Sequence, residues 1–261
     1  MIATSDNNPD VLNTNNNQPG KKTLGILQAG RAPEEIIDRY PDYNQLFVNL
    51  LGEQTFNYRS WPVLENEFPD SVEDADAWLI TGSRFGAYEP LEWIKPLEQL
   101  IRSIYDKGAP MIGICFGHQI IAQALGGKVE KFSGGWSVGR VQYTLDPQVF
   151  HNTSEHEQTP LMAFHQDQVV QLPSGAKNVG SSDICQNAAL VYDNRILTIQ
   201  PHPEFDYSFV DGLLKARGGI LPDDVIERAN QDLQEPVEQL PIAKTFIEFL
   251  NRDNSSLNTQ A

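Results

Sequence analysis

Residues 111–119 read Met111-Ile112-Gly113-Ile114-Cys115-Phe116-Gly117-His118-Gln119, and this stretch decides the fold. Residues 111–115 are fully apolar, which predicts a buried strand. A helical pattern follows over 117–125 and ends at a pair of glycines. A buried strand that turns tightly into a helix is typical of layered α/β domains with a largely parallel sheet.

The rest of the chain alternates strand and helix patterns in the same way. We expect strands at 24–29, 55–61, 77–80, 139–145, 164–172, 188–192 and 196–200, and helices at 43–51, 90–105, 209–214 and 242–250. The strands of the second half are separated by Gly, Pro, Asn and Asp, which favours antiparallel pairing there. The sequence therefore predicts an α/β fold: a mostly parallel sheet flanked by helices, with a smaller antiparallel sheet region.

Composition narrows the classes of function. The 261 residues carry 19 Lys and Arg against 35 Asp and Glu, a net charge of −16, which repels nucleic acids and anionic lipids. No stretch approaches the roughly 18 apolar residues of a membrane helix. Two cysteines are too few for a disulfide framework, so we expect a reducing, cytoplasmic compartment.

Both ends of the chain are polar. Residues 1–21 are rich in Asn and carry neither a basic nor an apolar signal segment, so we expect a disordered tail. Residues 251–261 have a similar composition and predict a flexible C-terminal tail. One domain is expected over residues 22–250.

The thiol of Cys115 lies at the predicted corner between strand and helix, with a glycine two residues before it and another two residues after it. This spacing is that of a nucleophile elbow, where glycine is needed because the turn leaves no room for side chains. A helix N-terminus favours thiolate over thiol and offers free N–H groups to an oxyanion. A buried structural cysteine is the alternative, but it would need no flanking glycines, and Cys185 has none of these features.

A base for this thiol follows the strand at 196–200. In Pro201-His202-Pro203-Glu204 the two prolines hold the backbone extended, so His202 and Glu204 point to the same side. Glu204 can then orient the imidazole while its other nitrogen faces the sulfur. A solvated loop is the alternative for these residues taken alone, and the elbow favours the catalytic interpretation.

Three ordered motifs give the chain a family resemblance, which covers roughly residues 23–250. They are Gly113-Ile114-Cys115-Phe116-Gly117-His118-Gln119, Phe164-His165-Gln166-Asp167-Gln168-Val169, and Pro201-His202-Pro203-Glu204-Phe205. With them the chain resembles the class I, triad-type glutamine amidotransferases, and is most similar to stand-alone proteins like the amidotransferase domain of GMP synthase. The resemblance implies a flavodoxin-like sheet and cleavage of a γ-glutamyl amide through a thioester. Cys115 would be the nucleophile, His202 the base and then the acid, and Glu204 its orienting partner.

The resemblance also implies roles around the triad. Gln119 would contact the α-amino and carboxylate end of the glutamyl group, and the backbone N–H of Phe116 would form half of the oxyanion hole. The other half would be the N–H of Ser83, with Gly82 giving the turn. The family's usual Gly-Gly-Pro stands here as Gly82-Ser83-Arg84, so a side chain and a charge replace glycine and proline.

The resemblance leaves two substrates open. The first expectation is a glutaminase that releases glutamate and ammonia, and a separate synthetase subunit is the possible ammonia acceptor. The alternative is a stand-alone hydrolase of γ-glutamyl peptides and amides with the same triad. Neither reaction implies a cofactor, and no Gly-rich phosphate loop indicates ATP. A non-enzymatic binding protein is disfavoured, because the three catalytic residues are all present.

Other candidate residues carry weaker signals. His165 and Asp167 could be metal ligands, but they have no third ligand nearby, so a structural pair and no metal site is the expectation. Trp136 is either a wall of the glutamyl pocket or a packed residue of a glycine-rich turn. A second cysteine-elbow group of enzymes would draw its acid from near the first strand, where Glu34 and Glu35 are the candidates.

Overall fold

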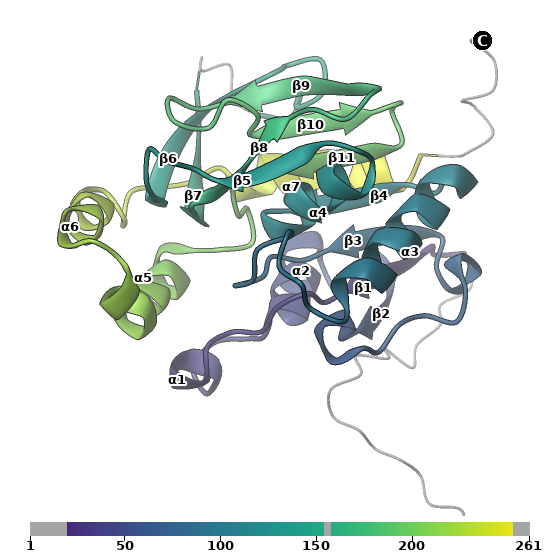
Figure 1. Cartoon of the computed structure of the whole chain (residues 1–261), viewed down its shortest axis with the longest axis horizontal. Helices are drawn as coiled ribbons and strands as arrows, with labels where there is room; N and C mark the ends of the chain where they lie inside the picture. The colour runs from purple at the N-terminus through teal and green to yellow at the C-terminus, as the bar shows by residue number, and fades with distance from the viewer. Residues whose placement is uncertain (1–19, 154–157, 253–261) are drawn as a thin grey trace, which may run out of the picture.

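The computed structural model describes residues 20–153 and 158–252, which form one mixed sheet of nine strands with helices on both faces (Figure 1). The strands are β1 (Thr23–Leu27), β2 (Asn57–Trp61), β3 (Ala77–Ile80), β4 (Met111–Ile114), β5 (Lys128–Lys131), β6 (Ser137–Leu145), β7 (Thr159–His165), β8 (Asp167–Gln171), β9 (Ala176–Ser181), β10 (Ala189–Tyr192) and β11 (Ile196–Ile199). The helices are α1 (Glu34–Ile37), α2 (Tyr43–Leu51), α3 (Ile94–Lys107), α4 (Phe116–Ala124), α5 (Tyr207–Arg217), α6 (Asp223–Gln231) and α7 (Gln239–Leu250). Three short 3-10 turns lie at Val63–Glu65, Val72–Asp74 and Gly218–Ile220.

The large sheet has a parallel half and an antiparallel half. Its order is β2-β1-β3-β4-β11-β10-β9-β6-β7. Neighbours from β2 to β11 are parallel, and those from β11 to β7 are antiparallel. Strands β5 and β8 form a separate antiparallel pair. The predicted fold class is therefore confirmed.

Helices cover the sheet in two layers. On one face α2 and α7 bury apolar side chains such as Phe47 and Phe246 against β1, β4 and β11. On the other face α3 and α4 do the same with side chains such as Leu97 and Ile121. A third apolar cluster joins α1, α5 and α6 beside β7, at the left of Figure 1.

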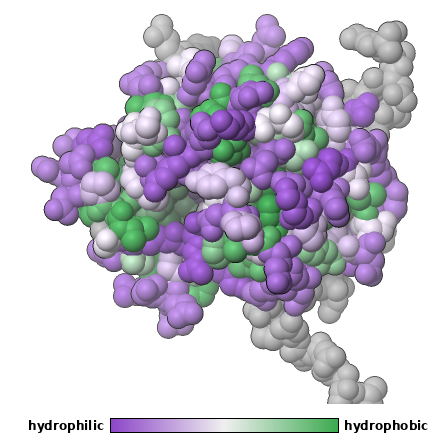
Figure 2. Space-filling model, in the orientation of Figure 1, coloured by the Kyte–Doolittle hydropathy of each residue, from purple (hydrophilic) through white to green (hydrophobic). Residues whose placement is uncertain are grey.

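The face of the molecule seen in Figure 2 is largely hydrophilic, as expected when the apolar side chains are buried between the sheet and the helices. Its hydrophobic side chains gather in small separate patches, one of them at the left where Figure 1 places α5 and α6. Within the described residues, every helix is too short or too polar to cross a membrane.

The second half departs from the sequence expectations in two places. The strand expected at 164–172 is two strands, because the chain leaves the large sheet at Gln166 and pairs next with β5. Strands β5 and β9 were not expected, because β5 is exposed at every residue except Val129 and β9 begins with exposed polar residues. Residues 1–19 and 253–261 lie outside the described residues, so the predicted tails remain predictions.

Two glycines allow α4 to approach the sheet closely. A Cβ at Gly117 would lie 2.3 Å from the carbonyl oxygen of Ile80 at the end of β3, and one at Gly113 would lie 2.6 Å from the carbonyl oxygen of Gly117. Both distances are far below van der Waals contact, and both opposing atoms belong to the backbone. The start of α4 therefore sits directly on the ends of β3 and β4.

We expect Gly117→Ala to destabilise the fold, because the added methyl group must push α4 away from β3. Overpacking of this kind costs roughly 1–3 kcal/mol or more in the free energy of unfolding. Gly219→Ala is the matched control, because a Cβ there would meet nothing within 4 Å. Thermal and urea unfolding measure both variants, and equal midpoints would contradict the close approach of α4.

Candidate active site

Cys115 occupies the corner between β4 and α4. Its φ is +52°, a left-handed conformation that residues other than glycine rarely adopt, and it is the N-cap residue of α4. Its N–H donates to the carbonyl oxygen of Ile199 at 2.9 Å, and its carbonyl oxygen accepts from the N–H of Gln119 at 3.0 Å. The backbone around the thiol is thus fixed on both sides, with the positive end of the helix dipole at the sulfur.

His202 lies in the turn that follows β11, the strand next to β4. Its N–H donates to the carbonyl oxygen of Met162 at 2.8 Å, and its Nδ1 lies 2.6 Å from Oε1 of Glu204. The ring stacks on Phe205, with the two centroids 4.0 Å apart and the planes 4° from parallel. His202 and Glu204 are both buried, and the contacts with Glu204 and Phe205 hold the ring in place.

The electrostatics of this group favour a charged imidazole. Burial lowers the pKa of His202, but the negative charges of Glu204 and Cys115 and their hydrogen bonds to the ring act the other way, and the net pKa is raised. A charged imidazole therefore faces the thiol of Cys115. By contrast, burial raises the pKa of Cys185 to about 12, so that thiol stays protonated.

The loop after β3 packs against the ring of His202. A Cβ at Gly82 would lie 2.9 Å from Cε1 of His202, and one at Gly30 would lie 2.7 Å from the carbonyl oxygen of Gly82. Glycine is therefore required at both positions. The following residue, Ser83, lines the same cavity as Cys115, while Phe116 is the first residue of α4, where a backbone N–H has no partner within the helix. Of the two residues expected to supply oxyanion donors, Ser83 thus borders the cavity of the thiol and Phe116 directly follows Cys115 in the chain.

The cavity above the thiol has a volume of about 230 Å³, which suits a glutamyl side chain. Gln119 lines it, with its amide donating to the carbonyl oxygen of Asp167 at 2.8 Å and to Oε1 of Gln200 at 3.1 Å. Trp136 forms a wall of this cavity and packs edge-on against Phe164, with ring centroids 6.1 Å apart. The pocket-wall interpretation of Trp136 thus agrees with its position.

Two further histidines, His118 and His165, have structural contacts. Burial lowers the pKa values of His118 and His165 to about 3, so both rings are neutral. His118 lies 2.7 Å from Oγ1 of Thr198, and His165 lies 3.2 Å from the carbonyl oxygen of Asp167. Within residues 20–153 and 158–252, no group of three or more His, Cys, Asp or Glu is placed to hold a metal ion.

Three residues near the triad were missed by the sequence reasoning, because they lie on distant helices with no local motif. Gln239 of α7 donates to the carbonyl oxygens of Pro203 and Phe205 at 2.8 and 2.9 Å, which holds the turn that carries His202. Tyr43 of α2 is buried beside the triad, and burial raises the pKa of its hydroxyl while the charge of Arg217 acts against that rise. Arg217 ends α5 and lines the cavity of Cys115.

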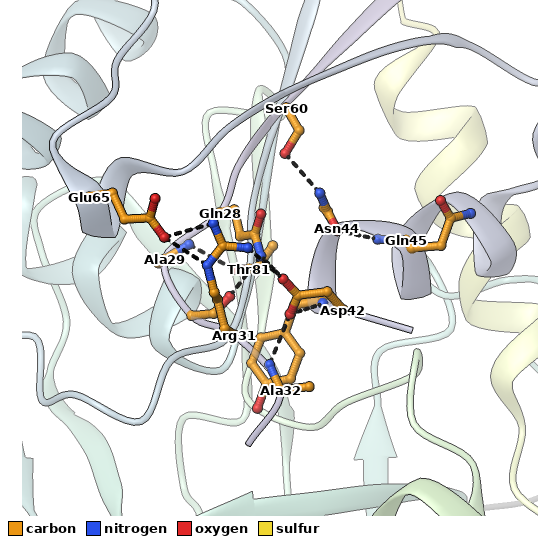
Figure 3. Close-up of polar contacts among 12 residues, drawn as sticks. Gln28, Ala29, Arg31, Ala32, Asp42, Asn44, Gln45, Ser60, Glu65 and Thr81 are labelled. Atoms are coloured by element: carbon orange, nitrogen blue, oxygen red, sulfur yellow. Dashed lines mark hydrogen bonds and ion pairs between the residues drawn. The ribbon is translucent and has the colours of Figure 1, made fainter. Parts of the chain in front are cut away.

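A polar network fixes the loops after β1 and β3 (Figure 3). Asp42, the N-cap residue of α2, accepts from Nε2 of Gln28 at 2.6 Å, from the N–H of Ala32 at 2.8 Å and from Nη1 of Arg31 at 3.0 Å. The N–H of Ala29 donates to Oγ1 of Thr81 at 3.0 Å. This network supports the loop that carries Gly82 and Ser83.

The two acidic residues near the first strand, the alternative candidates for the acid partner of the thiol, lie outside the cavity of Cys115. Glu34 and Glu35 are exposed on α1, and they line a neighbouring groove rather than the cavity of Cys115. The structure thus brings Cys115, His202 and Glu204 together and leaves these two carboxylates apart.

Comparison with known proteins identifies the family of the chain. γ-Glutamyl peptidase 4 of Arabidopsis thaliana is 28% identical over 207 residues, which cover 75% of this chain and 82% of the relative. One subunit of the glutamine-hydrolysing GMP synthase of Archaeoglobus fulgidus is 32% identical over 180 residues, covering 66% of this chain and 89% of the relative. The crystal structure of a glutamine amidotransferase from Methylobacillus flagellatus superposes with a TM-score of 0.71 at 20% identity, over 88% of this chain and 92% of the other. The family model for glutamine amidotransferase class-I matches residues 35–212, so the chain belongs to the class I glutamine amidotransferase family.

Proposed function

We propose that this chain is a hydrolase of γ-glutamyl peptides that works through a thioester on Cys115. The observation that carries the proposal is a groove of about 1170 Å³ that adjoins the catalytic cavity. The two hollows share the wall formed by Arg84, Phe85 and Arg217. Ammonia, the leaving group of glutamine, needs no such space, whereas an amino acid or a peptide does.

The first half-reaction would form the thioester. The thiolate sulfur of Cys115 attacks the carbonyl carbon of the γ-amide, and the N–H groups of Phe116 and Ser83 donate to the oxyanion that develops. His202 then gives its proton to the leaving nitrogen, the C–N bond breaks, and the amine departs. Glu204 keeps the imidazolium oriented through this transfer.

The second half-reaction would release glutamate. His202, now neutral, takes a proton from a water molecule, and the resulting hydroxide attacks the thioester carbon. The C–S bond breaks, the sulfur returns to thiolate, and the imidazolium is restored. Water is the only co-reactant, so the chemistry balances without a cofactor.

The relatives bear on the choice of substrate. Sequence reasoning placed glutamine first and γ-glutamyl peptides second, but the Arabidopsis relative is a γ-glutamyl peptidase and matches over three quarters of this chain. This similarity and the groove both favour the peptide. The similarity to the archaeal GMP synthase keeps glutamine hydrolysis, with ammonia passed to a separate synthetase protein, as the second candidate.

A substrate panel tests the proposal. The purified chain is incubated with glutamine, with γ-glutamyl dipeptides and with the isomeric α-glutamyl dipeptides, and released glutamate is measured over time. We expect γ-glutamyl dipeptides to have the highest kcat/KM and the α-isomers to be inert, because only the γ-amide reaches the sulfur when the glutamyl group fills its pocket. A higher kcat/KM for glutamine than for every dipeptide would favour the second candidate.

We expect Cys115→Ala to abolish glutamate release and Cys185→Ala to leave most of it. Only Cys115 combines a helix N-terminus with a charged imidazole, while Cys185 is a buried thiol with a pKa of about 12. Circular dichroism and thermal unfolding verify that both variants fold. Equal losses in two folded variants would contradict the assignment of the nucleophile.

Glu204→Gln should lower kcat by roughly 10²- to 10⁴-fold, because it removes the charge that orients and stabilises the imidazolium. The carboxylate raises the pKa of His202, so its loss lowers that pKa. The alkaline limb of the kcat/KM profile should therefore move to lower pH, since the proton donor is lost earlier. An unchanged rate and pH profile would show that Glu204 has no part in the reaction.

A further inference from the structure

Arg217 stands where three hollows of the surface meet. It lines the cavity of Cys115, the large groove beside it, and a small hollow bounded by His202, Tyr43 and Phe205. Among the described residues, it alone is shared by these three hollows. A molecule that reaches from the sulfur into the groove therefore crosses a wall that Arg217 helps to form.

The second arginine at this junction is Arg84. It lies in the wall between the catalytic cavity and the groove, with its guanidinium carbon 4.8 Å from the centroid of Phe85. Contact with an aromatic face leaves the N–H groups at the guanidinium edge available to an anion.

The arginines that line the groove differ in whether they form ion pairs. Arg31 is held by carboxylates, with its guanidinium 3.0 Å from Asp42 and 2.7 Å from Glu65 (Figure 3). Among residues 20–153 and 158–252, neither Arg84 nor Arg217 has a carboxylate within ion-pair distance. Glu34 and Glu35 also line the groove, but, of the described residues, the wall that it shares with the cavity of Cys115 carries the two guanidinium groups and no carboxylate, so this wall is the local site for an anion.

The position of His202 indicates which part of the proposed substrate lies near Arg217. The glutamyl group belongs in the cavity that Gln119 and Trp136 line, because Cys115 lines that cavity too. His202 must face the leaving nitrogen, since it delivers the proton there. The small hollow that holds His202 and Arg217 together therefore lies on the leaving-group side of the scissile bond.

We infer that Arg217, with Arg84 beside it, binds the carboxylate of the leaving amino acid or peptide, so that the preferred substrates are γ-glutamyl peptides with a free C-terminal carboxylate. This inference rests on the proposed function, because it concerns the product amine of that reaction. A guanidinium presents a planar fork of N–H donors that matches a carboxylate in two parallel hydrogen bonds. Arg217 is thus a specificity-determining residue, placed where the cavity of Cys115 meets the hollow on the leaving-group side.

The test compares two substrates that differ only in this carboxylate. γ-Glutamylglycine has it, and γ-glutamylglycinamide replaces it with a neutral amide of nearly the same size. We expect the native chain to favour the acid, and Arg217→Gln to lower the ratio of the two kcat/KM values by roughly 10- to 100-fold, the range of a charge-assisted hydrogen bond. Arg84→Gln should lower the ratio less, because Arg84 does not line the hollow of His202.

Lys215→Gln is the matched control. It removes one positive charge from the same helix, but Lys215 is exposed and paired with Asp211, outside the three hollows. We expect this variant to keep the native ratio, which separates a local contact from a change of net charge. Arg217→Lys should retain part of the preference, since it keeps the charge without the planar fork.

Other outcomes would overturn the inference in recognisable ways. Equal kcat/KM values for acid and amide in the native chain, with release that depends on Cys115, would refute carboxylate recognition while leaving the proposed hydrolase intact. An unchanged ratio in folded Arg217→Gln and Arg217→Lys would do the same. Absence of Cys115-dependent cleavage of both compounds would refute the proposed function and this inference together.

Discussion

The active site depends on how closely α4 approaches the ends of β3 and β4. Side chains at positions 113 and 117 would collide with the backbone, so the helix begins directly at the sheet edge only because both residues are glycine. At this tight corner Cys115 adopts the left-handed backbone conformation, which turns its side chain away from the sheet. The conformation costs free energy locally, of the order of 1 kcal/mol or more, and the surrounding packing of the helix offsets it.

Strand order then assembles the rest of the site. Strands β3, β4 and β11 are adjacent and parallel, so the residues that follow each of them meet at one edge of the sheet. Ser83 follows β3, Cys115 follows β4, and His202 follows β11. The antiparallel half contributes the carbonyl oxygen of Met162, and α7 contributes Gln239, which together hold the turn of His202. The whole fold therefore fixes the imidazole, and a local loop alone would not.

The sequence alone predicts those parts of the site that depend on short, continuous segments. The glycine spacing around Cys115 and the two prolines around His202 each encode a backbone shape, and apolar runs encode buried strands such as β3 and β4. Short segments could not indicate Tyr43, Arg217 or Gln239. Each lies on an amphipathic helix, and the apolar pattern of such a helix predicts only which side packs inward. The break between β7 and β8 was missed for a related reason: one alternating run continues while the chain changes its pairing partner.

The segment that matches the family model covers only one side of the candidate active site. The matching segment, residues 35–212, contains Cys115, His202 and Glu204, the proposed triad, but it ends before Arg217. Proteins of one family can share the arrangement that carries out a reaction and still differ in the residues that recognise the substrate. A residue at the end of α5 can change without disturbing the sheet edge that holds Cys115. The leaving-group side is therefore where a member of this family can acquire its own substrate preference.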